Sequence, residues 1–166
     1  MKKPIALIGF YGSSKESVGR RTAIELGIPF FDMGEHMCDS SGMTLLQLYE
    51  KTGEDGYRRF ERLSLSTLAA LGGLVATTGG CVLSTFSRRL LHEGFLSFFL
   101  DTPFELLIDF IHPSRHPTVG SLSRLELVRL YEYSQMMYRQ TAHHTIDASQ
   151  PVGDIVEHIL DIALAD

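Results

Sequence analysis

GFYGSSKES, residues 9–17, is the stretch that decides the fold of this chain. It follows the short apolar run Ile5–Ile8, and the residues after it have the apolar spacing of a helix. A buried strand, a glycine-containing loop and a helix are the setting of the pattern G-x-x-x-x-G-K-S/T, in which backbone N–H groups and a lysine hold phosphate groups. The stretch therefore predicts a nucleotide-binding loop, made of Gly9, Gly12, Ser13, Ser14, Lys15, Glu16 and Ser17.

Two positions of the loop depart from that pattern. Ser14 stands at its second glycine, and Glu16 stands where a hydroxyl residue contacts Mg²⁺. If Ser14 needs a positive φ, the strain is about 1–2 kcal/mol. A carboxylate about 4 Å from a phosphate oxygen opposes binding by roughly 4 kcal/mol at an effective dielectric of about 20. Glu16 relieves that repulsion only if it ligates the magnesium ion itself, so we expect weakened ATP binding.

The composition predicts one globular domain over residues 1–166, because 44% of the 166 residues are hydrophobic and 21% are charged. The net charge of −5, without a run of lysine and arginine, argues against nucleic-acid and anionic-membrane partners. The apolar run Pro4–Phe10 is too short for a secretory signal, and no stretch is long enough to span a bilayer, so we expect a cytoplasmic protein. Cys38 and Cys81 have no pairing or metal spacing and are expected to be free thiols.

Apolar runs and helical patterns alternate along the chain, which favours an α/β fold: a three-layer, doubly wound, parallel five-stranded sheet with helices on both faces. The expected strands are residues 5–8, 29–32, 74–78, 96–100 and 145–147. The expected helices are residues 17–26, 44–51, 55–71, 85–91, 104–111, 123–142 and 152–164. Ligands gather at the carboxyl ends of such strands, where Asp32 ends the second one.

With these pieces in order, the chain resembles the shikimate kinase family almost from end to end. The resemblance rests on the loop, on Phe30-Phe31-Asp32, on Gly56-Tyr57-Arg58-Arg59-Phe60-Glu61, on Thr78-Gly79-Gly80, on Leu100-Asp101-Thr102-Pro103-Phe104-Glu105 and on His144-Thr145-Ile146-Asp147. It implies a P-loop kinase fold with a short lid at about residues 112–122, and ATP and magnesium as cofactors for phosphorylation of the 3-hydroxyl of shikimate.

On the nucleotide side, the resemblance implies a catalytic role for Lys15 and a metal-binding role for Asp32, which Glu16 would share. The family's lid arginine before a proline is replaced by His116, so Arg115 would supply that charge. Phe110 stands where the family has an adenine-side arginine; it either stacks on adenine or packs in the core.

On the substrate side, the resemblance implies contacts from Asp32, Gly34, Arg58, Gly79 and Gly80. Gly34 replaces the carboxylate that would accept the hydroxyl proton, and the neighbouring Glu35 is expected to point elsewhere. Arg58 would bind the substrate carboxylate or be a solvated helix residue.

Ser134 replaces the family's second substrate arginine, and Cys81 adds a side chain beside the glycine turn. These losses predict a shikimate-kinase-like protein that lacks shikimate kinase activity and acts in binding, regulation or assembly, with a small-molecule ligand or another protein as its partner. The alternative is an active ATP-dependent kinase for shikimate or a related hydroxy acid.

Overall fold

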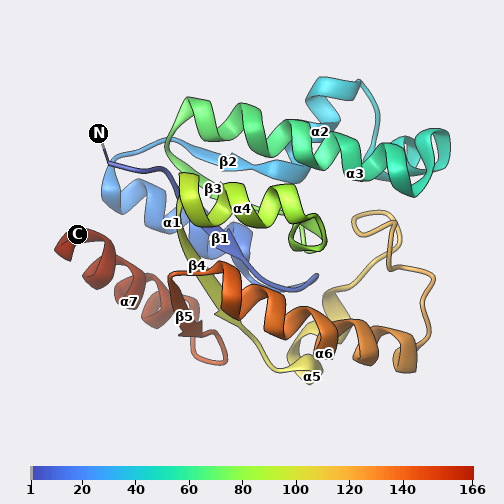
Figure 1. Cartoon of the computed structure of the whole chain (residues 1–166). Helices are drawn as coiled ribbons and strands as arrows, with labels where there is room; N and C mark the ends of the chain where they lie inside the picture. The colour runs from blue at the N-terminus through green and yellow to red at the C-terminus, as the bar shows by residue number, and fades with distance from the viewer. Residues whose placement is uncertain (1) are drawn as a thin grey trace.

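A five-stranded parallel sheet forms the centre of the protein in a computed structural model that describes residues 2–166 (Figure 1). The strands are β1 (Ile5–Ile8), β2 (Phe30–Asp32), β3 (Leu74–Ala76), β4 (Leu96–Asp101) and β5 (His144–Asp147). Their order in the sheet is β2-β3-β1-β4-β5, and every pair is parallel. The doubly wound sheet predicted from the sequence is confirmed.

Helices cover both faces of this sheet (Figure 1). They are α1 (Lys15–Leu26), α2 (Met33–Ser41), α3 (Leu45–Leu71), α4 (Thr85–Gly94), α5 (Phe104–Leu107), α6 (Arg124–Thr141) and α7 (Val152–Ala165), with 3₁₀ turns η1 (Cys81–Leu83) and η2 (Ile108–Phe110). α1 and α7 pack on one face, and α3, α4 and α6 pack on the other. None of the helices in residues 2–166 is long and apolar enough to cross a membrane.

Strand β1 shows why the sequence of a strand in this sheet is apolar throughout. Ala6 and Ile8 belong to the core cluster under α3, α4 and α6, whereas Ile5 and Leu7 belong to the cluster under α1 and α7. Successive strand side chains point to opposite faces, so a strand that is buried on both faces needs apolar residues throughout. This sheet presents its carboxyl ends to the loop at residues 9–15, which is where the sequence places the functional residues.

The structure differs from the expected elements at α2, which was not predicted. Asp32 begins this helix as its N-cap, because its side chain accepts a hydrogen bond from the backbone N–H of Glu35 at 3.0 Å. Gly42 ends the helix in the left-handed conformation, with φ of 70°. A turn of helix directly after β2 changes where the next carboxylate lies.

Two further elements are altered. The expected helices 44–51 and 55–71 form the single element α3, which is broken at Gly53 because that residue has a positive φ of 70° and a ψ of −174°. The expected helix 104–111 is reduced to the four residues of α5 and the turn η2. The loop that follows, residues 112–122, contacts the loop at residues 9–17 where the Thr118 Oγ1 lies 3.3 Å from the Tyr11 hydroxyl oxygen, and we call it the lid after the prediction from the sequence.

Candidate functional site

An open cleft of about 1720 Å³ lies at the carboxyl ends of the strands. Pockets for a single small ligand commonly measure roughly 300–1,000 Å³, so this cleft has room for two ligands. One side is formed by the loop at residues 9–17, the lid and the start of α7; the other is formed by α2 and the start of α3. We call these sides the loop half and the α2–α3 half.

Lys15 is the most constrained charge in the loop half. Its side chain is buried, with 7% exposed, and its Nζ donates to the backbone oxygens of Gly9 at 2.8 Å and Phe10 at 2.9 Å and to the Ser13 Oγ at 3.0 Å. Burial lowers the pKa of this lysine to about 8. The lysine therefore shapes the loop around itself and keeps its charge near neutral pH.

The strain expected at Ser14 does not arise. Ser14 has φ of −79° and ψ of 28°, so it does not adopt the positive φ that would strain a serine. The positive φ of the loop, 83°, lies at Gly12, where an added Cβ would also lie 2.8 Å from the backbone oxygen of Leu107. The loop therefore needs a glycine at position 12 and does not need one at position 14.

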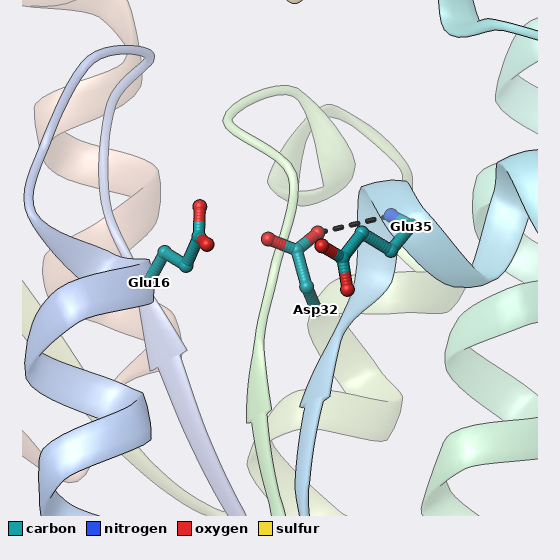
Figure 2. A group of neighbouring side chains, drawn as sticks. All are labelled: Glu16, Asp32 and Glu35. Carbon is teal, nitrogen blue, oxygen red and sulfur yellow. Dashed lines mark hydrogen bonds between the residues drawn. The ribbon is translucent and has the colours of Figure 1, made fainter.

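Three carboxylates from three elements meet in the cleft (Figure 2). Glu16 comes from the first turn of α1, Asp32 from the end of β2 and Glu35 from the first turn of α2. One oxygen of each lies within 4.8 Å of the others. The expectation that Glu35 points elsewhere was wrong, because residues 33–41 form a helix that returns its side chain toward Asp32. Carboxylate oxygens are suitable ligands for Mg²⁺.

Glu16 also connects the lid to the loop. Its Oε2 lies 3.2 Å from the Arg115 guanidinium and its Oε1 lies 3.4 Å from that of Arg20. The structure therefore brings the lid arginine to the head of α1, beside the position where the pattern places phosphate groups.

The lid packs on the loop through His116. Its ring lies edge-on to Tyr11, with 5.8 Å between ring centroids, and its Nδ1 accepts a hydrogen bond from the backbone N–H of His112 at 3.1 Å. Burial, followed by the charges of Lys15 and Arg115, lowers the pKa of His116 to about 4. The ring is therefore neutral at pH 7, so the positive charge of the lid is carried by Arg115.

Phe110 lines the cleft with 61% of its surface exposed. The sequence left open whether Phe110 stacks on adenine or packs in the core, and the structure places its side chain outside the core. The residues Ser149–Val152, at the start of α7, line the cleft as well. The sequence analysis missed this segment, because nothing in its residues marks it as part of a site.

The α2–α3 half contains no arginine or lysine among the residues that line it, within the described part of the chain. Its lining includes Gly34, Cys38, Asp39, Met43, Thr44, Leu45 and Tyr57. The cleft's cations, Lys15, Arg20, Arg21 and Arg115, all come from the loop, α1 and the lid. In α6, Ser134 is buried and its Oγ donates to the Leu130 oxygen at 2.7 Å.

Arg58 lies behind the cleft wall. Its side chain is 13% exposed, and its Nη1 donates to the Glu61 Oε1 at 2.7 Å. Burial would lower the pKa of this guanidinium, but the adjacent Glu61 carboxylate raises it above its usual value. Glu54 lies 3.5 Å from the other terminal nitrogen. Both ends of the guanidinium fork thus face carboxylates of α3.

Comparison with known proteins agrees with this arrangement. A shikimate kinase family profile matches residues 11–163. The chain is 33% identical to shikimate kinase 2 of Pectobacterium atrosepticum over 165 residues, covering 96% of this chain and 95% of that protein. It is 32% identical to the shikimate kinase of Dechloromonas aromatica over 166 residues, covering 96% and 89% respectively. The chain belongs to the shikimate kinase family.

The fold of this shikimate kinase family member also matches a solved relative. Shikimate kinase from Acinetobacter baumannii in complex with shikimate superposes with a TM-score of 0.92 at 28% identity, covering 99% of this chain and 94% of that one. Shikimate kinases are transferases that use ATP and magnesium.

Most residues singled out from the sequence of this family member do meet in one cleft. Those that line it are Gly12, Ser13, Ser14, Lys15, Glu16, Ser17, Asp32, Gly34, Gly79, Phe110 and Arg115. Gly9, Arg58 and Gly80 do not line it. Cys38 and Cys81 are free thiols, as expected, and burial raises the pKa of Cys81 to about 12.

Proposed function

We propose that this shikimate kinase family member binds nucleotide and magnesium in the loop half of its cleft. We propose further that it has lost the binding and phosphorylation of shikimate and acts as a binding or regulatory protein. The observation that carries the proposal is the position of Arg58. The one arginine that the family resemblance assigns to the substrate carboxylate is paired with Glu61 and does not line the cleft.

The loop half supports nucleotide binding. Lys15 and the backbone at the head of α1 offer positive charge to phosphate groups. The unstrained conformation of Ser14 removes one of the two objections that the sequence raises. The second objection is the charge of Glu16, and its proximity to Asp32 and Glu35 answers it, because three carboxylates can hold the magnesium ion that screens them from the triphosphate.

The α2–α3 half supports the loss of shikimate. Shikimate is a carboxylate, and the α2–α3 half presents Asp39 and no lysine or arginine among its own described lining residues, with Asp32 and Glu35 at its border, so it offers an acid no paired cation. Gly34 offers no side chain to accept the hydroxyl proton, and Ser134 offers no charge to the acid group. Each missing contact weakens binding and transition-state stabilisation together.

A second candidate function is an active kinase for another hydroxyl compound, and the position of Glu35 favours it. Its carboxylate lies beside Asp32, where it can accept the proton of an attacking hydroxyl group in place of the missing side chain at Gly34. Phosphoryl transfer would then proceed from MgATP to a substrate without a carboxylate.

Calorimetry separates these functions. Titration with ATP in the presence and absence of magnesium should give heat of binding only with the metal, and titration with shikimate should give none. The Acinetobacter baumannii shikimate kinase serves as the positive control for shikimate. Binding of shikimate by this chain, followed by ADP release in a coupled assay, would contradict the proposed function. ADP release with a neutral hydroxyl compound but not with shikimate would establish the second candidate.

A further inference from the structure

Tyr11 fills the space between the loop and the glycine turn at residues 79–80. The tyrosine is 5% exposed. A Cβ added to Gly79 would lie 2.7 Å from the Tyr11 ring, and one added to Gly80 would lie 2.3 Å from the Tyr11 hydroxyl oxygen. The turn therefore approaches the tyrosine so closely that only glycine fits at either position.

The same turn brings Tyr11 to Arg58. A Cβ added to Gly80 would also lie 2.1 Å from the Arg58 Nη1. The tyrosine hydroxyl and the guanidinium therefore both border the same position of the glycine turn. The hydroxyl oxygen also lies 3.3 Å from the Thr118 Oγ1 of the lid. Tyr11 thus closes the side of Arg58 that faces the loop, the lid and the cleft.

The other sides of the guanidinium are closed by fixed groups. Glu61 accepts hydrogen bonds from both Arg58 and the Thr78 Oγ1, and its side chain is only 2% exposed. The Tyr138 hydroxyl donates to the Gly79 oxygen at 2.7 Å and holds the glycine turn in place. Tyr11 and Gly79 line the cleft whereas Arg58 and Gly80 do not, so Tyr11 is the side chain of this contact that a ligand in the cleft meets.

We infer that Tyr11 determines the class of second ligand that the cleft accepts. Its ring and hydroxyl close Arg58 off from the cleft, and the α2–α3 half, which is lined by carboxylates, then accepts a neutral hydroxyl compound and excludes an acid. This inference rests on the proposed loss of shikimate binding, and it assigns that loss chiefly to one residue of the loop.

The matched pair of probes is shikimate and its methyl ester, which has the same ring and hydroxyl groups without the negative charge. By calorimetry, the wild-type protein should bind the ester at least as well as the acid. Tyr11→Ala opens the path to Arg58, so the variant should bind shikimate about tenfold or more tightly than it binds the ester, the effect of one or more charge-assisted hydrogen bonds.

Two further variants test whether the gain in shikimate affinity comes from opening the path to Arg58. Tyr11→Phe keeps the ring but removes the hydroxyl beside the guanidinium, so its gain for shikimate should be smaller than that of Tyr11→Ala. Arg58→Lys in the Tyr11→Ala background keeps a charge opposite Glu61 but loses the planar fork, so the gain for shikimate should fall by about tenfold. Circular dichroism checks that each variant is folded, and Tyr11→Met, which keeps more of the side-chain volume, replaces the alanine variant if that one is not.

The outcomes are distinct. If folded Tyr11→Ala and Tyr11→Met variants show no gain for shikimate over the wild type, or if Arg58→Lys leaves the gain intact, the inference about Tyr11 is wrong while the proposed function stands. If the wild type itself binds shikimate more tightly than the ester, both the proposed function and this inference are overturned.

Discussion

The loop half and the α2–α3 half of the cleft differ in the sign of the charges that they present. The loop half offers Lys15, Arg20, Arg21 and Arg115. The α2–α3 half offers Asp39, and the carboxylates of Glu16, Asp32 and Glu35 lie between the two. A phosphate-rich ligand with a bound cation suits the first, whereas an acid suits neither the second nor the boundary between them.

The two halves also differ in how they hold their arginines. Arg115 belongs to the exposed lid and reaches Glu16 at the head of α1, an ion pair of the kind that contributes only about 0–1 kcal/mol. Arg58 is partly buried, with 13% of its side chain exposed, and its partner Glu61 is buried. The charge of Arg115 is therefore free to exchange its partner for a ligand, whereas that of Arg58 is held by a buried carboxylate.

The largest expected effect is the loss of stability when the ion pair between Arg58 and Glu61 is broken. Glu61→Ala leaves the Arg58 charge with only the exposed Glu54 as its partner, so it should lower the free energy of unfolding by up to about 3–5 kcal/mol. Urea denaturation measures the change. The double variant Arg58→Met, Glu61→Leu removes both charges and should recover most of the loss. A loss below about 1 kcal/mol for Glu61→Ala would mean that Arg58 is free to turn toward the cleft.

The loop half could be predicted from the sequence because its residues are neighbours in the chain. Strand β1, the glycines, Lys15 and the helix start follow one another within residues 5–26 and carry a recognisable pattern. The parallel direction of the strands was also accessible, since alternating strands and helices favour a parallel sheet. The conformation of Ser14 was not, because its φ depends on how the loop wraps around Lys15.

The α2–α3 half was predicted less well because its contacts join distant segments. Helix α2 has few apolar residues, although Asp32, Glu35 and Gly42 are the cap residues of a short helix and could have revealed it. Without the helix, Glu35 was given the wrong direction. The closure of Arg58 by Tyr11 joins residues 11, 58 and 80, and no local pattern signals it.

The next effect concerns the charge of Lys15 and tests whether the loop half binds phosphate. Because burial lowers the pKa of this lysine to about 8, the lysine loses its proton above that pH. Affinity for MgATP should be constant below pH 8 and fall about tenfold per pH unit above it. Calorimetry at pH 7, 8 and 9 measures the fall, and Lys15→Arg, which stays charged, should show none. An unchanged affinity at pH 9 in the wild type would mean that nucleotide does not contact Lys15.

A smaller effect separates the lid from the rest of the loop half. The folded-state pKa of His116, about 4, lies below its ordinary value of about 6.5, so the unfolded chain binds more protons between these two pH values. The stabilising contribution is present above pH 6.5 and is lost as the pH falls toward 4. The melting temperature of the wild type should therefore fall more between pH 7 and pH 5 than that of His116→Phe. Equal falls would show that the His116 ring is solvated and the lid is open.

The smallest effect is expected for a substitution at Ser14. It is informative because Gly12, in the same loop, should respond much more strongly. Ser14 has an ordinary φ of −79° and no side-chain cap hydrogen bond, so Ser14→Gly relieves no strain and adds only the conformational entropy of glycine in the unfolded chain. It should destabilise the protein by about 0.5–1 kcal/mol or less and leave MgATP affinity within about twofold. Gly12→Ala, at φ of 83°, should cost at least about 1–2 kcal/mol. If Ser14→Gly instead stabilised the protein, the serine would be strained, and the sequence-based objection to nucleotide binding in the loop half would stand.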